Sequence, residues 1–191
     1  MGSLYHTAWN VKELKEEYGL KMAVETGTAH GDGTRYLVSF FEKVFTIEIN
    51  SELFDANLDS FSKHPNIYKY LGKTVDNLPG ILELNKDTPT FFWLDAHLPQ
   101  GEGHSEEVYL PLEEELRVIK KNKDTSKDVL LIDDLRIYED GPFQAGNWVK
   151  RHDYSNTAEG VNFVRELFAE THSIEKSYKD EGYLLLSPLS K

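Results

Sequence analysis

Five short runs of the chain are apolar at consecutive positions, the pattern of strands buried on both faces of a parallel sheet. Between these runs, apolar residues recur at helical spacing instead. Alternation of the two patterns predicts an α/β fold in which helices connect parallel strands. The runs are Met22–Val24, Val44–Ile47, Ile67–Leu71, Phe91–Leu94 and Val129–Ile132.

The helical patterns include one with clear boundaries. Val11, Leu14 and Tyr18 fall on one helical face, Asn10 precedes them as a good N-cap, and Gly19 supplies the end. Other apolar faces predict helices that cover the sheet: Leu53, Phe54, Leu58 and Phe61 after the cap residue Asn50, then Leu112, Leu116 and Ile119, then Val161, Val164 and Phe168.

The end of the chain follows a different pattern. Ser173–Ser177 and Tyr183–Ser187 are separated only by the short, turn-rich stretch 178–182, which is too little for a crossover helix. An antiparallel C-terminal hairpin is therefore expected. The whole pattern predicts a Rossmann-like three-layer sandwich with a mostly parallel, seven-stranded sheet. Without repeats or long linkers, residues 1–191 are expected to form a single domain.

Composition narrows the chemistry and the partners. The chain has no cysteine, so any metal must bind oxygen or imidazole ligands. Its net charge of -12 would repel a phosphate backbone, which favours a small-molecule acceptor and argues against nucleic acid. No apolar run is long enough to span a membrane, and no signal pattern opens the chain. A cytoplasmic protein without membrane partners is expected, and homo-oligomerisation stays open.

A glycine-rich turn follows the first predicted strand. In the segment Val24–Thr34, glycines at 27, 31 and 33 permit positive φ and let a ligand approach the backbone. The next strand ends at Glu48, and an acid at the tip of the second strand is where the ribose hydroxyls of an adenosine cofactor are held. The two features together predict a cofactor site.

This segment, ETGTAHGDGT, resembles the first motif of the class I S-adenosylmethionine-dependent methyltransferases, and Glu48 resembles the ribose-binding acid of their second motif. The resemblance implies S-adenosylmethionine as cofactor, with Glu25 supporting the turn near the methionine amine. Lys73 stands where relatives often carry Asp, and Thr74 either contacts the cofactor or caps the helix beginning near Val75. The implied cofactor residues are Glu25, Gly27, Thr28, Gly31, Gly33, Glu48, Thr74 and Asp95.

Two other functions compete with this one. The same turn matches the T-G-x-x-x-G-x-G spacing of nicotinamide-dependent short-chain oxidoreductases. That family also needs Tyr-x-x-x-Lys for proton transfer, and none of the ten tyrosines has Lys four residues later. The second alternative is a catalytically silent S-adenosylmethionine-binding protein, because the chain is near the minimal size for the fold.

Three carboxylates and an imidazole follow the fourth and fifth predicted strands. Asp95 and His97 leave one strand tip, and Asp133 and Asp134 leave the other. Because the carboxyl ends of parallel strands meet at one edge, these groups should converge there. Such crowding of negative charge is costly without a cation at its centre, so a divalent metal is predicted.

The D-x-H and D-D pattern resembles the metal-dependent macrocin and novobiocin type of sugar O-methyltransferases. The resemblance implies that Asp95, Asp133 and Asp134 bind the metal, Mg in the first instance, and that His97 is the catalytic base. Relatives often place a second Asp at the position of His97, so His97 could instead ligate a softer metal such as Mn or Fe.

The sequence therefore predicts an O-methyltransferase for a hydroxyl of a sugar or other small metabolite. The activated sulfonium methyl needs alignment and a deprotonated acceptor oxygen, which the metal and His97 would supply. The segments 98–109 and 140–154 are expected to cover the acceptor. Arg136 is expected to orient the aspartates as an ion-pair partner, and Glu113–Glu115 to line a solvated helix face.

Overall fold

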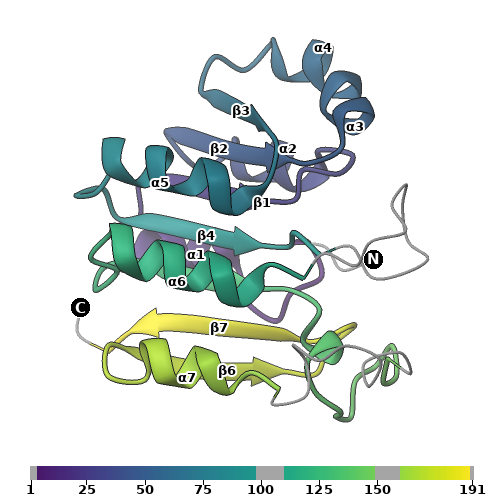
Figure 1. The fold of residues 1–191 in the computed structure, drawn as a ribbon, viewed down its shortest axis with the longest axis vertical. Coiled ribbons are helices and arrows are strands. Elements are labelled where there is room, and N and C mark those ends of the chain that lie inside the picture. The colour runs from purple at the N-terminus through teal and green to yellow at the C-terminus, as the bar shows by residue number, and fades with distance from the viewer. Residues whose placement is uncertain (1–3, 98–109, 149–159, 190–191) are drawn as a thin grey trace.

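The computed structural model describes residues 4–97, 110–148 and 160–189, and a seven-stranded sheet runs through its centre (Figure 1). The strand order is β3-β2-β1-β4-β5-β7-β6. Neighbours from β3 to β5 are parallel, whereas β7 is antiparallel to both β5 and β6. The strands are β1 Met22–Thr26, β2 Lys43–Glu48, β3 Ile67–Leu71, β4 Thr90–Leu94, β5 Val129–Ile132, β6 His172–Ser177 and β7 Tyr183–Pro188.

Helices cover both faces of this sheet. In Figure 1, α5, α6 and α7 lie in front of the sheet and α1 lies behind it. Apolar side chains from the two faces of β1, β2, β4, β5 and β7 pack into two separate core clusters, one under each helical layer. The helices are α1 Val11–Tyr18, α2 Asp32–Leu37, α3 Ser51–Ala56, α4 Leu58–Phe61, α5 Thr74–Leu84, α6 Leu112–Asn122, the 3-10 helix η1 Leu135–Ile137, and α7 Asn162–Phe168.

The predicted three-layer sandwich is confirmed, and local sequence explains much of it. Strands β1, β4 and β5 are buried along their whole length, as runs of consecutive apolar residues require. Helix α1 begins after Asn10, whose side chain accepts hydrogen bonds from two backbone amides, and it ends at Gly19 in the left-handed conformation. The antiparallel C-terminal hairpin also forms, with Ser173 opposite Ser187.

The helix expected to carry Leu53 to Phe61 is wrong in one respect: it is two short helices, α3 and α4, divided at Asn57. The amide of the Asn57 side chain donates to the backbone oxygens of Leu53 and of Ala29, which lies in the turn after β1. This tertiary bond fixes Asn57 at the break. Phe61 is buried, whereas Leu58 remains exposed.

The sequence contains no apolar run long enough to span a membrane, and the helices of the structure can be examined for the same property. Within the described ranges, no helix combines the length and the apolar character that crossing a bilayer requires.

Candidate active site

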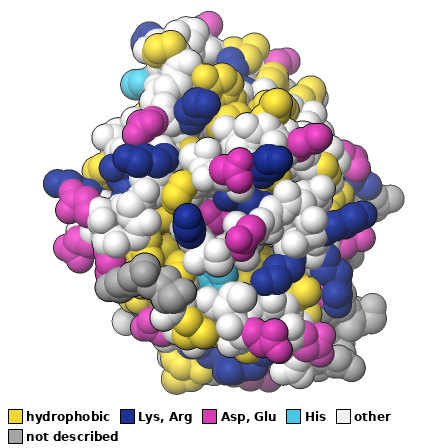
Figure 2. All heavy atoms as spheres, turned by 90° about the vertical axis from the view of Figure 1, so that its left-hand side faces the viewer, with side chains coloured by type: hydrophobic (Ala, Val, Ile, Leu, Met, Phe, Trp, Pro, Cys, Tyr) yellow, Lys and Arg dark blue, Asp and Glu magenta, His cyan; other side chains and the backbone are white. Residues whose placement is uncertain are grey.

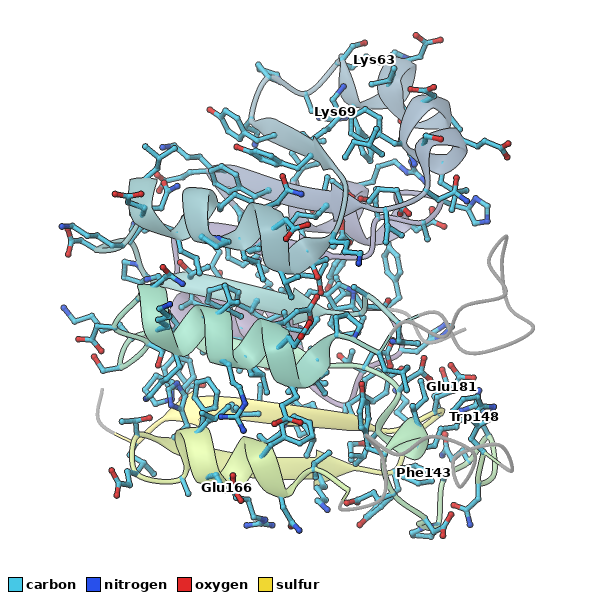
Figure 3. The ribbon with its side chains drawn as sticks, viewed as in Figure 1. Lys63, Lys69, Phe143, Trp148, Glu166 and Glu181 are labelled. Carbon is cyan, nitrogen blue, oxygen red and sulfur yellow. The ribbon has the colours of Figure 1, made fainter. Side chains whose placement is uncertain are left out.

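The carboxyl ends of the five parallel strands meet at one edge of the sheet, on the right in Figure 1. Glu181 lies on this same side of the molecule because the turn between β6 and β7 returns to it, and Trp148 lies on this side as well (Figure 3). Open α/β sheets bind ligands at this edge.

Gly27, in the turn after β1, and Gly33, in the first turn of α2, both lie where a side chain would collide with a neighbouring residue. Gly27 has φ +84°, and a Cβ atom there would collide with the backbone oxygen of Asp95 at the tip of β4. A Cβ atom on Gly33 would collide with the carboxylate of Glu25. Helix α2 begins at Asp32 with Gly31 as its N-cap.

Glu25 is a buried carboxyl group held by hydroxyls. The hydroxyls of Thr34 and Thr46 are hydrogen-bonded to its Oε2 atom, the latter at 2.7 Å. Burial raises the pKa of Glu25 to about 7 despite these hydrogen bonds. Thr28 continues the network, with its hydroxyl 2.6 Å from that of Thr46. Glu25 and its partners therefore tie β1, β2 and α2 together beneath the glycine-rich turn.

Glu48 ends β2 with a nearly buried carboxylate that faces this turn. Its Oε2 atom accepts a hydrogen bond from the Ala29 amide and its Oε1 atom accepts one from the Asn50 amide, both at 2.8 Å. Each carboxylate oxygen can accept a further hydrogen bond. Glu48 is thus fixed in orientation and keeps capacity for a hydroxyl-bearing ligand.

His97 lies between two carboxylates. Its Nε2 atom is hydrogen-bonded to Oδ2 of Asp134, and its Nδ1 atom is 3.7 Å from Oδ1 of Asp95. Burial by itself lowers the pKa of His97, but the negative charges of Asp134 and Asp95 outweigh burial and raise that pKa to about 10. One ligand atom from each of the three residues lies within 4.8 Å of the others.

Asp133 lies beside this group but is oriented differently. Its Oδ1 atom accepts the backbone amide of Asp134 at 2.8 Å, and the nearby charge of Asp95 adds to burial in raising its pKa well above the ordinary value. Within the described part of the chain, Asp133 Oδ2 and Asp134 Oδ1 are buried oxygens without a hydrogen-bond partner. Converging oxygen and imidazole ligands with unsatisfied buried oxygens fit a divalent cation.

Arg136 has the ion-pair role that the sequence suggested, with one partner that was missed. Its guanidinium is hydrogen-bonded to Oε1 of Glu181, and its Nε atom is 3.8 Å from Oδ1 of Asp134. Glu181 arrives from the turn between β6 and β7. The hairpin prediction contained this signal, because the turn of such a hairpin lies at the carboxyl edge of the neighbouring parallel strand.

Glu115 corrects the expectation that Glu113–Glu115 line a solvated face. It is 1% exposed, and its carboxylate accepts hydrogen bonds from the hydroxyls of Thr26, at 3.5 Å, and of Thr74. Burial raises its pKa to about 7. Thr74 is the first residue of α5, and the N-cap of this helix is Lys73. The alternative role of Thr74 as the helix cap is therefore wrong.

A small cavity opens beside Glu115, between the tips of β4 and β5 and the first turn of α6. His97, Asp133 and Tyr138 line it together with apolar side chains. It has room for about one water-sized group. Glu115 and the side chains that follow β4 and β5 therefore face the same cavity.

The two expected covers of the site are described only in part. The segment 98–109 lies outside the described residues, as does 149–154. The described part of the second cover packs on the core: the ring of Phe143 is 5.1 Å from that of Tyr178, and Trp148 contacts the same cluster. Phe143 and Trp148 come to the strand-tip side of the molecule in Figure 3.

No protein-family model matches this chain, and no curated protein matches it. Solved structures do match its fold. The O-methyltransferase of Bacillus cereus, solved with SAH, has a TM-score of 0.62 at 14% identity, over 96% of this chain and 84% of that one. The O-methyltransferase TomG of Streptomyces achromogenes, solved with SAM, has a TM-score of 0.57 at 14% identity, over 93% and 77%.

An rRNA methylase of Streptococcus thermophilus is also similar, with a TM-score of 0.55 at 12% identity, over 96% of this chain and 99% of that one. These matches, with the strand order and the antiparallel hairpin, define the fold of the class I S-adenosylmethionine-dependent methyltransferases. At such low identity they establish the fold alone, and the relatives act on different classes of acceptor.

Proposed function

We propose that this protein is an S-adenosylmethionine-dependent, divalent-metal-dependent methyltransferase that acts on a hydroxyl of a small molecule, a sugar or a secondary metabolite. One observation carries the proposal. The glycine-rich turn with Glu48 and the Asp95, His97 and Asp134 group occupy neighbouring strand tips of a methyltransferase fold. A methyl donor and an activated acceptor would thereby meet at one edge.

The cofactor would bind along the tips of β1, β2 and β4. Glu48 would accept hydrogen bonds from the ribose hydroxyls, since both of its oxygens retain acceptor capacity. The backbone at Gly27 would lie against the methionine part, because no side chain intervenes there. Glu25 and Thr28 would support this turn from below rather than reach the cofactor.

The metal would be held by Asp95 and Asp134, with Asp133 or His97 completing the protein ligands. When bound, a divalent cation lowers the pKa of a hydroxyl that it polarises. His97 would receive the acceptor proton. Its imidazole becomes a base only when another cation neutralises Asp95 and Asp134, because these carboxylates otherwise hold it protonated.

A small acceptor is preferred over nucleic acid on electrostatic grounds. The chain carries a net charge of -12. Figure 2 shows the amino-end face of the sheet, opposite the candidate site, where basic and acidic side chains are interspersed. A phosphate backbone requires concentrated positive charge. Because one of the similar structures is an rRNA methylase, RNA is the alternative acceptor against which small molecules are to be compared.

The test is transfer of radiolabel from S-adenosylmethionine to a panel of sugars, other hydroxylated metabolites and total RNA, with Mg²⁺ or with EDTA. We expect label in a small hydroxylated acceptor, and loss of that label in EDTA. Label that appears only in RNA would contradict the proposed acceptor class. Transfer that is unaffected by EDTA would contradict the metal.

A further inference from the structure

Glu115 is a buried carboxylate that the proposed reaction does not use. Helix α6 directs it inward, with Leu112, Leu116 and Ile119 on the same buried face. Its carboxylate accepts the hydroxyls of Thr26 and Thr74, but its Oε1 atom is buried without a hydrogen-bond partner among the described residues. An unsatisfied buried carboxylate oxygen is costly unless a ligand supplies a donor.

The cavity beside Glu115 places this oxygen next to the proposed acceptor site. Asp133, whose Oδ2 atom is also buried without a partner, lines the same cavity together with His97. Room for about one water-sized group suits a single donor group rather than a whole ring. A ligand would therefore extend one small polar substituent into the cavity.

The charge of that substituent follows from its surroundings. Among the residues described here, no Lys or Arg lines the cavity. His97, which lines the cavity, is paired with Asp134, and Arg136 is paired with Glu181. A protonated amine supplies several N–H donors and the opposite charge, so it satisfies the unpartnered Oε1 atom of Glu115 better than a neutral hydroxyl does, and Asp133 Oδ2 stays available to the proposed metal.

We propose that this cavity binds the protonated amino group of the methyl acceptor, so that the substrates are amino alcohols, amino sugars included. That the amine belongs to a methyl acceptor rests on the proposed function. That the cavity binds an amine does not. The cofactor also carries an amino group, on the methionine part proposed to lie at Gly27, and saturation with S-adenosylhomocysteine fills that site, so an amine that binds in addition occupies a separate one. The acceptor is therefore the expected source.

The experiment compares ethanolamine with ethylene glycol, a pair that differs in one ammonium against one hydroxyl. Binding to the protein saturated with S-adenosylhomocysteine and Mg²⁺ is followed by NMR titration at pH 7. We expect ethanolamine to bind about tenfold more tightly, as a charged hydrogen bond predicts. Glu115→Gln should abolish this preference, and Glu114→Gln, an exposed neighbour on the same helix, should retain it.

Three results would overturn the proposal: equal binding of the two probes, an unchanged preference in Glu115→Gln, or a loss of S-adenosylhomocysteine affinity in that variant, which would assign the amine to the cofactor. If Glu115→Gln does not fold, Glu115→Asp is the second variant, because its shorter side chain moves the carboxylate away from the cavity. It should weaken the binding of ethanolamine and leave the binding of ethylene glycol unchanged. Repeating the titrations without S-adenosylhomocysteine separates the two proposals. A protein that binds no cofactor but keeps the Glu115-dependent preference contradicts only the methyltransferase function.

Discussion

The Nε2 atom of His97 is hydrogen-bonded to Oδ2 of Asp134, which ties the segment after β4 to the turn after β5. The contact depends on the backbone of Asp134, which has the left-handed φ of +52° that Asp tolerates better than most residues. Although burial raises the pKa of Asp134, the positive His97 outweighs it and lowers that pKa to about 2. The pair therefore persists as an ion pair at neutral pH.

Replacing His97 distinguishes a base from a metal ligand. His97→Ala should lower turnover of an acceptor found in the screen by about 10²- to 10⁴-fold, the range for loss of a general base, with metal content retained after dialysis. His64→Ala on the surface serves as the control. Loss of the metal in His97→Ala would place His97 among the ligands and leave the base unassigned.

Replacing Asp134 tests the metal site itself. Asp134→Asn removes a charge from the group formed with Asp95 and His97, so Mn²⁺ binding measured by calorimetry should weaken by at least about tenfold. Asp124→Asn changes an exposed aspartate and should leave binding unchanged. Equal affinity in the two variants would show that the metal, if bound, lies elsewhere.

Replacing Glu48 tests the cofactor side. Glu48→Ala removes the acceptor proposed for the ribose hydroxyls, and a charged hydrogen bond is worth about 1 to 3 kcal/mol. Affinity for S-adenosylhomocysteine should fall by the corresponding factor in calorimetry, while Glu52→Ala, exposed on α3, should bind as the parent does. An unaltered affinity in Glu48→Ala would remove Glu48 from the site.

Glu25 should make stability depend on pH. Its pKa is raised by burial from 4.5 to about 7, so the folded protein holds this proton more tightly than the unfolded chain does. The stabilisation from protonated Glu25 is complete below about pH 4.5 and is lost as the pH rises through about 7, a change of up to about 3 kcal/mol.

Chemical denaturation across pH 4.5 to 8 measures this effect of Glu25. Glu25→Gln should gain stability relative to the parent as the pH rises, while Glu16→Gln, exposed on α1, should run parallel to the parent. Parallel curves for Glu25→Gln and the parent would mean that the pKa of Glu25 is not raised.

The sheet and its carboxyl edge could be predicted from sequence because their causes are local. Runs such as Phe91–Leu94 are apolar on both faces only in buried strands, and Asn10 and Gly19 mark the ends of α1 by capping. The convergence of Asp95 with Asp134 followed from the strand topology.

Other features depend on contacts between distant residues. The break between α3 and α4 comes from the bond between Asn57 and Ala29, which no helical pattern contains. The burial of Glu115, in contrast, can be predicted from the sequence. The spacing of Leu112 and Leu116 puts position 115 on the buried face of α6. The expectation that a charged residue is exposed points the wrong way at this position, and the helical period is the better guide.

The cofactor that binds at this edge decides between the methyltransferase and the oxidoreductase function. Isothermal titration of the protein with S-adenosylmethionine, S-adenosylhomocysteine, NAD and NADP measures this directly. We predict saturable binding of the two sulfur compounds, weakened by Glu48→Ala, and no heat from the nicotinamides. Saturable binding of NAD or NADP together with no binding of S-adenosylmethionine would contradict the methyltransferase function and favour the oxidoreductase instead.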